Sequence, residues 1–351
     1  MPTGETIMQM KEDRGTKTEQ VRDGVLRAVL HGDFKPGDKL PPERDMARST
    51  RTSRITVRRA YEEMEAAGIL DRARGRGTYL RTQVRGHGSS GSMVALLASV
   101  RDPFMLEFIT ALDAAMVSQG GVLALRLTNE DPSREERAAM ELVARGLRDV
   151  IVWPSGQELS VSVFERLRIL GTNMVFFDRM FPGAYADYVG LDNRHAIRLL
   201  MDLAGRRGRR SALFVSHSRL GADSDKDREE AFMRLCRDRA LAHRLVRVPW
   251  KGNVPGAVQL NRRRWLHGLN DPAVLCVNDD VAVAVRRSMP DRVPVFGIDG
   301  LPEAIAAGIP TVSQPMAAMA QRAIQMLREQ QRMGVSWVSR RVFCKGRLVA
   351  P

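Results

Sequence analysis

Arginines with helical spacing stand out near the N-terminus of this chain. Arg51, Arg54 and Arg58 follow one another at intervals of three and four residues. On a helix their guanidinium groups would leave on one side, with Ser53 and Thr56 beside them. Arginine in the first turns of a helix can bind guanine O6 and N7 in the major groove of DNA, with about 1–3 kcal/mol of discrimination. The pattern therefore predicts a helix that reads base edges.

Caps and helix breakers indicate the elements that would hold these arginines. A short helix is expected after Pro41 and Pro42, because proline fits the first helical turn, where its missing N–H would have no partner. A second helix is expected to begin at Thr52 or Ser53, both good N-caps, and to end at Gly68. Its apolar residues recur at spacings of three and four and would pack on a core; they are Val57, Ala60, Tyr61 and Met64.

Two further segments complete a small domain at residues 16–81. From Thr18 an amphipathic helix is expected that ends near His31 and Gly32. Residues 69–80 indicate two short strands around the turn at residues 74–77, whose arginines could reach phosphates or the neighbouring minor groove. The alternative is a solvated, arginine-rich helix, since this chain uses arginine where many proteins use lysine. The spacing of caps, proline and glycine favours DNA binding.

These residues resemble the winged helix-turn-helix domain of GntR-family bacterial regulators. The matching pieces are PG at 36–37, LPPER at 40–44, SRITVR at 53–58, Leu70 and GRGT at 75–78. Position 42 is often serine or alanine in that family and is proline here. The resemblance implies that eight residues contact DNA: Arg44, Ser53, Arg54, Thr56, Arg58, Arg74, Gly75 and Arg76.

The composition fits a polyanion partner and two domains. With 351 residues the chain can form one small and one large domain, each with its own core. The formal charge is +14. Lys and Arg outnumber Asp and Glu by 18 to 13 in residues 1–85 and by 37 to 28 in the rest, so the excess is not confined to the basic helix.

Cysteine usage and hydropathy indicate a compartment. Cys236, Cys276 and Cys344 are far apart and form no CxxC or Cys/His spacing, which argues against a disulfide framework or a zinc site. No apolar run has the length of a signal peptide core or a membrane span. We expect a cytoplasmic protein with no metal, no cofactor and no membrane partner.

Beyond residue 81 the pattern changes. Residues 1–15 are expected to be disordered, and residues 82–92, rich in glycine and serine, to form a flexible linker. In residues 93–351 short β-branched runs alternate with amphipathic stretches, which is typical of doubly wound parallel sheets, and the number of strands favours two lobes. Strands are expected at 93–98, 122–127, 149–153, 174–178, 188–191, 212–216, 245–249, 273–277, 294–298 and 311–313, and helices at 104–119, 133–146, 158–170, 193–206, 226–239, 256–267, 279–288 and 315–332.

Polar side chains follow most of these strands. Ligands of open parallel sheets bind outside the carboxyl ends of the strands, so the acids, amides and arginines there suit a polyhydroxylated ligand. Phe104, Trp153 or Trp250 could cover an apolar sugar face. The plainer interpretation is that an Asp or Asn at a strand end forms a turn or caps a helix, which is the more frequent case for any one of them.

At these strand ends the chain resembles the effector domain of LacI/GalR-family regulators and periplasmic binding proteins. The matching pieces are DPF at 102–104, VGLDN at 189–193, Asp227 and Arg228 with Ala231 and Phe232, Asn278 and Asp279 with Ala282, VFGID at 295–299 and TVSQP at 311–315. The family usually has glycine at position 231. The resemblance implies an α/β, two-lobed, periplasmic-binding-protein-like domain whose effector contacts are Arg228, Asn278, Asp279, Asp299 and Gln314, with Phe104, Asp178 and Arg179 as further candidates.

Together these features predict a dimeric transcriptional regulator. It would bind double-stranded operator DNA, respond to a sugar or sugar derivative held between the lobes, and repress genes of carbohydrate metabolism. One alternative is a DNA-binding protein whose large domain only dimerises. Another is a fusion with a pyridoxal-phosphate enzyme, which is disfavoured because none of the lysines beyond the linker, Lys226, Lys251 and Lys345, follows a strand in a suitable setting.

Overall fold

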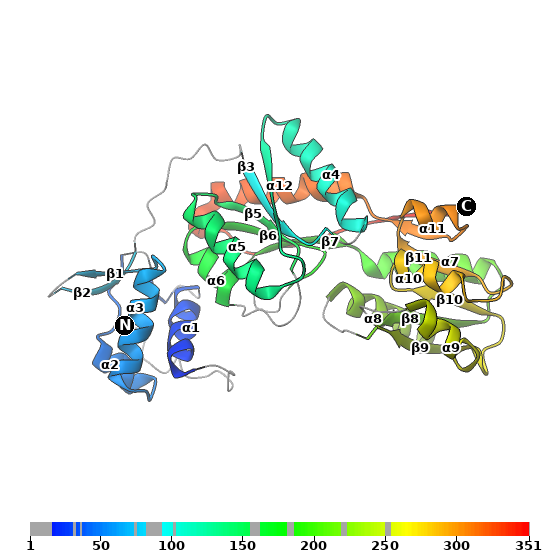
Figure 1. The fold of residues 1–351 in the computed structure, drawn as a ribbon, viewed down its shortest axis with the longest axis horizontal. Coiled ribbons are helices and arrows are strands. Elements are labelled where there is room, and N and C mark those ends of the chain that lie inside the picture. The colour runs from blue at the N-terminus through cyan, green and yellow to red at the C-terminus, as the bar shows by residue number, and fades with distance from the viewer. Residues whose placement is uncertain are drawn as a thin grey trace.

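The computed structural model describes residues 16–30, 33–35, 37–73, 76–81, 93–100, 103–154, 162–180, 186–218, 223–249 and 254–350. The expected disordered segment and linker, together with Arg74, Gly75 and Trp250, lie outside the described residues. The chain forms three bodies: a small helical domain, an N lobe and a C lobe, each lobe built on a six-stranded sheet, with the chain crossing more than once between the lobes (Figure 1). Among the described residues, no helix combines the length and the apolar character needed to cross a membrane.

The small domain has the predicted order of three helices and a hairpin. Ser53 caps the third helix, and the strands pair antiparallel from Leu70 with Leu80 to Ala73 with Gly77. Tyr61 is fully buried at its centre and donates a hydrogen bond of 2.9 Å from Oη to the carbonyl oxygen of Pro41. The elements are α1 (Lys17–Leu30), α2 (Glu43–Ser49), α3 (Arg54–Ala66), β1 (Leu70–Ala73) and β2 (Gly77–Leu80).

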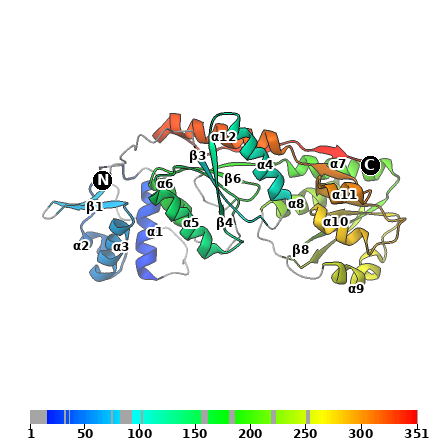
Figure 2. The ribbon, with the colours of Figure 1, turned by 45° about the horizontal axis from the view of Figure 1, so that its top comes forward.

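The N lobe is a parallel sheet in the order β13-β7-β6-β5-β3-β4. Alternate strand residues point to opposite faces, so the sheet shares one apolar cluster with α4 and α12 and another with α5 and α6. Helix α12 lies beside α4 in both ribbon views (Figures 1 and 2). The elements are β3 (Met93–Ala98), α4 (Pro103–Val117), β4 (Val122–Leu127), α5 (Pro132–Ala144), β5 (Asp149–Val152), α6 (Ser162–Ile169), β6 (Asn173–Phe177), β7 (Asp187–Leu191), α12 (Met316–Met333) and β13 (Arg341–Cys344).

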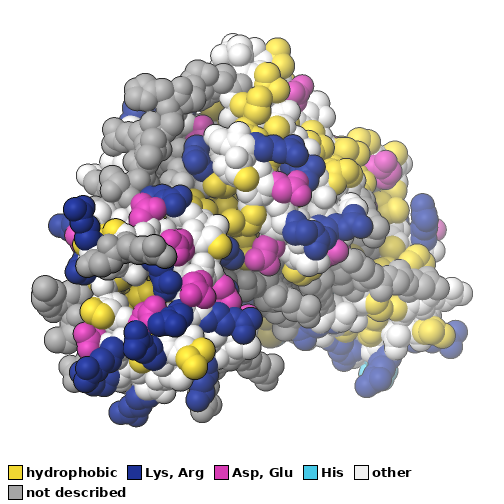
Figure 3. Space-filling model, turned by 60° about the vertical axis from the view of Figure 1, so that its left-hand side comes forward, with side chains coloured by type: hydrophobic (Ala, Val, Ile, Leu, Met, Phe, Trp, Pro, Cys, Tyr) yellow, Lys and Arg dark blue, Asp and Glu magenta, His cyan; other side chains and the backbone are white. Residues whose placement is uncertain are grey.

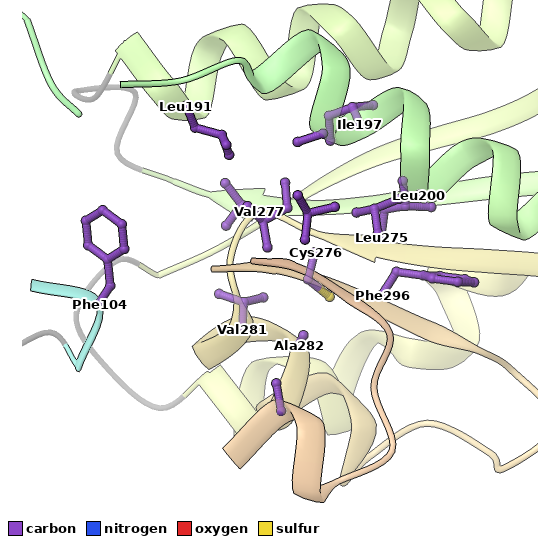
Figure 4. Packing of buried hydrophobic residues seen from close by; sticks show 14 of the residues in the cluster. Phe104, Leu191, Ile197, Leu200, Leu275, Cys276, Val277, Val281, Ala282 and Phe296 are labelled. Carbon is purple, nitrogen blue, oxygen red and sulfur yellow. The ribbon is translucent and has the colours of Figure 1, made fainter. Parts of the chain in front are cut away.

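The C lobe has the strand order β14-β12-β11-β10-β8-β9, parallel except for β14. Figure 4 shows Ile197 and Leu200 approaching its strands from one side, and Val281 and Ala282 from the other. The elements are α7 (Asn193–Arg206), β8 (Ser211–His217), α8 (Asp223–Asp238), β9 (Ala242–Val248), α9 (Val254–Leu266), β10 (Pro272–Cys276), α10 (Asp279–Arg286), β11 (Val295–Asp299), α11 (Pro302–Ala306), β12 (Thr311–Ser313) and β14 (Arg347–Val349).

Three connections join the lobes, after β7, after β12 and after β13. They meet at Gly346. A Cβ atom there would lie 2.8 Å from the carbonyl oxygen of Ser313 and 3.1 Å from Cδ1 of Leu191, which leaves no room for a side chain. The three connections are therefore packed against one another where any movement between the lobes would be centred.

No strand was predicted after residue 332, but the structure has two there. After the short 3-10 turn η1 (Gly334–Ser336), strand β13 returns to the N lobe beside β7, and β14 pairs with β12 in the C lobe. These strands are short and partly exposed and contain arginine, so their local pattern is weak; they form because the neighbouring strands offer free edges. Helix α11 was also missed, and it has only five residues.

The small domain lies against the N lobe. Helices α1 and α6 are neighbours, and Leu170 at the end of α6 packs on the apolar core of the small domain. Burial lowers the pKa of Arg166 on α6, and the like charge of Arg22 on α1 adds to this effect. Apolar and charged side chains of α1 and α6 therefore form the contact between the small domain and the N lobe.

Candidate functional site

The N-terminus of α3 carries two of the three predicted arginines, Arg54 and Arg58. The prediction that Arg51 leaves the same helix is wrong, because Arg51 lies in the turn before the N-cap Ser53, with φ of 49°. The Ser53 hydroxyl accepts a hydrogen bond of 3.0 Å from the backbone N–H of Thr56, which starts the helix. Arg54 and Arg58 then leave the first two turns, with side chains 66% and 50% exposed. The buried face of the helix packs on the domain core, so these guanidinium groups are presented to solvent on a rigid element.

Glu43, which no motif of its own marks as functional in the sequence, organises these arginines. Its carboxylate lies 3.3 Å from Nε of Arg54, 3.2 Å from Nη2 of Arg58 and 3.1 Å from Nη2 of Arg72 in β1. Partial burial alone would raise the pKa of Glu43, but hydrogen bonds from Arg58 and Arg54 lower it. Glu43 therefore stays ionised and ties α2, α3 and the hairpin together, with two guanidinium groups held side by side.

The remaining predicted DNA contacts are distributed around this centre. Arg44 is exposed on α2, and Arg76 is exposed in the turn of the hairpin. Arg74 and Gly75 lie outside the described residues. Figure 3 shows Lys and Arg side chains gathered on the side where the small domain lies, with acidic side chains between them. The described candidates all belong to the small domain, and their contacts with DNA remain predictions.

In the N lobe, three of the aromatic and charged candidates form one cluster. Arg179 stacks over the Trp153 ring, with Cζ 3.7 Å from the ring centroid, and donates from Nη1 to the carbonyl oxygen of Pro154 at 3.3 Å. The indole Nε1 of Trp153 lies 3.4 Å from Oδ2 of Asp178. Glu130, which the sequence analysis missed, lies 3.7 Å from Nη1 of Arg179. The side chains of these four residues are all buried: Trp153, Asp178, Arg179 and Glu130.

Asp178 links this cluster to the C lobe. Burial raises the pKa of its carboxyl group, while the positive charges of Arg228 and Arg179 oppose that rise. Since Arg228 belongs to α8 of the C lobe, charged side chains of the two lobes lie close enough to interact. Asp178 also has φ of 59°, a left-handed conformation that costs energy outside glycine and is common at functional sites.

Among the predicted effector contacts of the C lobe, Arg228 is buried and makes two hydrogen bonds. It donates from Nε to Oδ1 of Asn193 at 2.8 Å and from Nη1 to the carbonyl oxygen of Val277 at 2.7 Å. Nearby on the same lobe, Nδ1 of His217 lies 3.0 Å from Oδ2 of Asp225. Asp225 was not singled out from the sequence, because it lies inside an acidic helical run with no motif of its own.

Asp299 and Gln314 form the second C-lobe pair, at the ends of β11 and β12. Nε2 of Gln314 donates to Oδ1 of Asp299 at 2.9 Å, and Asp299 has φ of 134°. Within the described part of the chain, Oε1 of Gln314 and the hydroxyls of Ser99 and Ser216 are buried without a hydrogen-bond partner. Buried polar atoms of this kind are unusual and suit a polar ligand at the strand ends.

Three predicted effector contacts have visible structural roles. Asn278 caps α10, its Oδ1 accepting from the N–H of Val281 at 3.0 Å. Asp279 is fully buried, and its carboxylate accepts hydrogen bonds from the N–H groups of Gly300 and Leu301 in the loop after β11. Phe104 belongs to the apolar core and stacks on Phe177 at 5.7 Å between ring centroids, and in Figure 4 it stands apart from the C-lobe side chains. Whether any of the three also contacts an effector stays a prediction.

Family models match both parts of the chain. Residues 17–80 match the model described as bacterial regulatory proteins, gntR family. Residues 200–349 match the model described as a periplasmic binding protein-like domain. These ranges cover the small domain with its basic helix and nearly all of the C lobe together with the returning strands.

Whole-length similarity extends this result. The chain is 24% identical over 347 residues to the arabinose metabolism transcriptional repressor of Geobacillus stearothermophilus, covering 91% of this chain and 92% of that protein. Among solved structures it is similar in fold to the periplasmic ribose ABC transporter protein of Conexibacter woesei, with a TM-score of 0.65, 19% identity and coverage of 76% of this chain and 94% of that one. The trehalose repressor of Escherichia coli gives a TM-score of 0.63 at 16% identity, covering 74% of this chain and all of the other.

Proposed function

Because the chain joins a GntR-family DNA-binding domain to a periplasmic-binding-protein-like domain, we propose that it is a sugar-responsive transcriptional repressor. The small domain would bind operator DNA in the cytoplasm through α3 and the hairpin. The two lobes would bind the sugar at the carboxyl ends of their strands. The arabinose repressor of Geobacillus stearothermophilus, similar over almost its whole length, supports a pentose as the first effector to test.

One observation carries the effector proposal: buried charged groups of both lobes meet at the strand ends. Asp178 follows β6 of the N lobe, and the positive charge of Arg228 acts on its carboxyl group. Arg228 lies on α8 of the C lobe and donates to the carbonyl oxygen of Val277, which follows β10, so both groups are at the edge where open parallel sheets bind ligands. A hydroxylated ligand between the lobes could accept a hydrogen bond from the arginine and donate one to the carboxylate. It would then favour one relative position of the lobes over another.

A change in lobe position could reach the DNA-binding domain through the connections that meet at Gly346 and through the contact between α1 and α6. The ligand can shift the equilibrium only by its difference in affinity for the two states. A shift from 1:99 to 99:1 would require about 5.5 kcal/mol.

Arg228→Lys is expected to weaken binding of L-arabinose at least tenfold and to leave operator affinity in the absence of sugar unchanged. Lysine keeps the charge but loses the planar fork that holds Asn193 and the Val277 carbonyl. Titration calorimetry of the full chain measures the affinity for L-arabinose. Fluorescence anisotropy with labelled operator DNA measures the affinity for operator. Arg234→Lys, an exposed change on the same helix, is the control.

The same measurements separate the alternatives. If wild-type protein binds neither L-arabinose nor any other pentose, hexose, uronate or sugar phosphate in a thermal-shift screen, the large domain only dimerises and the effector proposal is wrong. Loss of both sugar and operator binding in Arg228→Lys would indicate a folding role.

We also propose that the protein is a homodimer that pairs through the N lobe. Strand β4 is at the edge of its sheet and exposes Leu125 and Leu127, and Leu106 and Val117 of the adjacent α4 are exposed as well. An exposed apolar edge favours self-association, because a monomer would leave it in water. A second copy related by two-fold symmetry would cover the same surface on each subunit.

Leu125→Glu with Leu127→Glu is expected to convert the dimer to a monomer, since each copy would place two carboxylates in an apolar interface. Sedimentation velocity at several protein concentrations measures the change. Val338→Glu, an exposed apolar position before β13 at the opposite edge of the sheet, should leave the dimer intact. A wild-type monomer, or a double variant that dimerises like wild type, would contradict the proposal.

A further inference from the structure

A basic cavity lies on the C lobe, between the edge strand β9 and helix α9. Its volume is about 900 Å³, which is in the range of small-molecule sites. Four arginines and a histidine contribute to its wall together with one tryptophan: Arg244, Arg247, Arg263, Arg264, Trp265 and His267. No aspartate or glutamate is among the described residues that line it.

The arginines of this cavity differ in how they are held. Arg244 donates to the carbonyl oxygen of Trp265 at 2.7 Å, so its guanidinium group is fixed against the C-terminus of α9. Arg247 has one carboxylate partner, Oε2 of Glu229 at 2.7 Å. Arg263 and Arg264 are exposed, and within the described part of the chain no carboxylate lies within ion-pair distance of either one or of Arg244. The wall therefore carries a clear excess of positive charge.

Such a concentration of like charges is unfavourable unless something offsets it. Elsewhere this chain places carboxylates beside its grouped arginines, as Glu43 does for Arg54 and Arg58. A concave wall with one sign of charge focuses the electrostatic potential and raises the local concentration of anions. Guanidinium groups match phosphate oxygens in bidentate geometry, and α9 supplies two of them beside Arg244 of β9.

We propose that this cavity is a second ligand site, separate from the strand ends between the lobes, and that it binds a small phosphorylated anion. Arg263 and Arg264 of α9, with Arg244 of β9 beside them, would hold its phosphoryl oxygens. Arg247 is three residues from Arg244 along the strand, so its side chain leaves the opposite face, where it pairs with Glu229 of α8. The site explains part of the positive charge that lies outside the DNA-binding domain, where Lys and Arg exceed Asp and Glu by 37 to 28 after residue 85.

The test uses inorganic pyrophosphate as the probe and the full chain in titration calorimetry. Wild-type protein should bind it saturably, and Arg263→Gln with Arg264→Gln should weaken binding at least tenfold. The matched control is Arg234→Gln with Arg237→Gln, which removes two exposed arginines from α8 of the same lobe and should change the affinity less than twofold. Thermal unfolding of both double variants establishes that they are folded.

Three outcomes would overturn the proposal. One is wild-type protein that shows no saturable binding of pyrophosphate. Another is equal weakening by the two double variants, which would indicate only the general charge of the protein. The third is an altered oligomeric state in Arg263→Gln with Arg264→Gln and unchanged pyrophosphate affinity, which would assign the surface to contact with a second copy.

Discussion

Replacing Asp279 with alanine is expected to lower the free energy of unfolding of the C lobe by about 2–5 kcal/mol, since two buried donors, the N–H of Leu301 and the hydroxyl of Thr311, lose their acceptor at about 1–3 kcal/mol each, and the N–H of Gly300 keeps only the Thr311 hydroxyl. Oδ2 of Asp279 accepts from the N–H of Gly300 at 2.8 Å and from that of Leu301 at 2.7 Å, and Oδ1 accepts from the hydroxyl of Thr311 at 2.7 Å. The carboxylate thus joins the start of α10 to the turn after β11 and to β12.

Asp279→Asn is the matched variant. Its amide oxygen can still accept from Gly300 and Leu301, and its amide nitrogen can donate to the hydroxyl oxygen of Thr311, so the expected loss is below about 1.5 kcal/mol. Differential scanning calorimetry should show the C-lobe transition of the alanine variant lowered on the order of 10 °C and that of the asparagine variant by much less.

Gly297 supports this assignment. A Cβ atom at residue 297 would lie 2.0 Å from Oδ1 of Asp279, so the carboxylate occupies the space that a side chain would need. If Asp279→Ala keeps the wild-type transition and instead loses binding of L-arabinose, the internal network is dispensable, and the effector contact that the family resemblance implies is the correct role.

The second large effect concerns DNA. Arg54→Ala with Arg58→Ala is expected to weaken operator binding at least about 100-fold, because each arginine that contacts a base or phosphate contributes about 1–3 kcal/mol. Both side chains leave the exposed N-terminal turns of α3, and Glu43 holds them side by side in the absence of DNA. Fluorescence anisotropy at several salt concentrations measures the affinity.

Salt dependence shows which contact is lost. If the arginines bind phosphates, the slope of log affinity against log salt should fall by about one for each arginine, with equal weakening on unrelated DNA. If they read bases, the preference for operator should fall instead. Arg59→Ala is the control, since Arg59 is exposed on the same helix and pairs with Glu63, four residues along the helix.

Unchanged operator affinity in the Arg54 and Arg58 double variant would remove α3 from the interface. Loss of the thermal transition of the small domain would show instead that the ion pairs with Glu43 are needed for folding. Circular dichroism of the double variant separates these two results.

The predicted elements of the small domain and the alternation of strands and helices are confirmed. These features come from local causes. Ser53 begins α3 through its own hydrogen bond and Gly68 terminates it through its positive φ. Runs such as residues 150–152 are apolar because both faces of a parallel strand are buried. Helix caps, glycine at positive φ and apolar runs can therefore be recognised without knowledge of the fold.

Contacts between distant segments could not be predicted in the same way. Glu43 meets Arg72 across 29 residues, and Glu130 meets Arg179 across 49, with no motif to mark either pair. Strand β13 forms only because the edge of β7 is free, and its own pattern is weak.

The sequence by itself thus determined the two kinds of domain, their order and the strand ends at which polar groups gather, since periodicity, caps and charge are local properties. Only the tertiary structure decided how each polar group is used. Short polar residues at strand ends have three different uses: Asn278 caps a helix, Asp279 supports a loop, and the carboxyl group of Asp178 interacts with a charge of the other lobe. The difference arises from which donors and charges the fold brings within a few ångströms, and sequence spacing does not encode that distance.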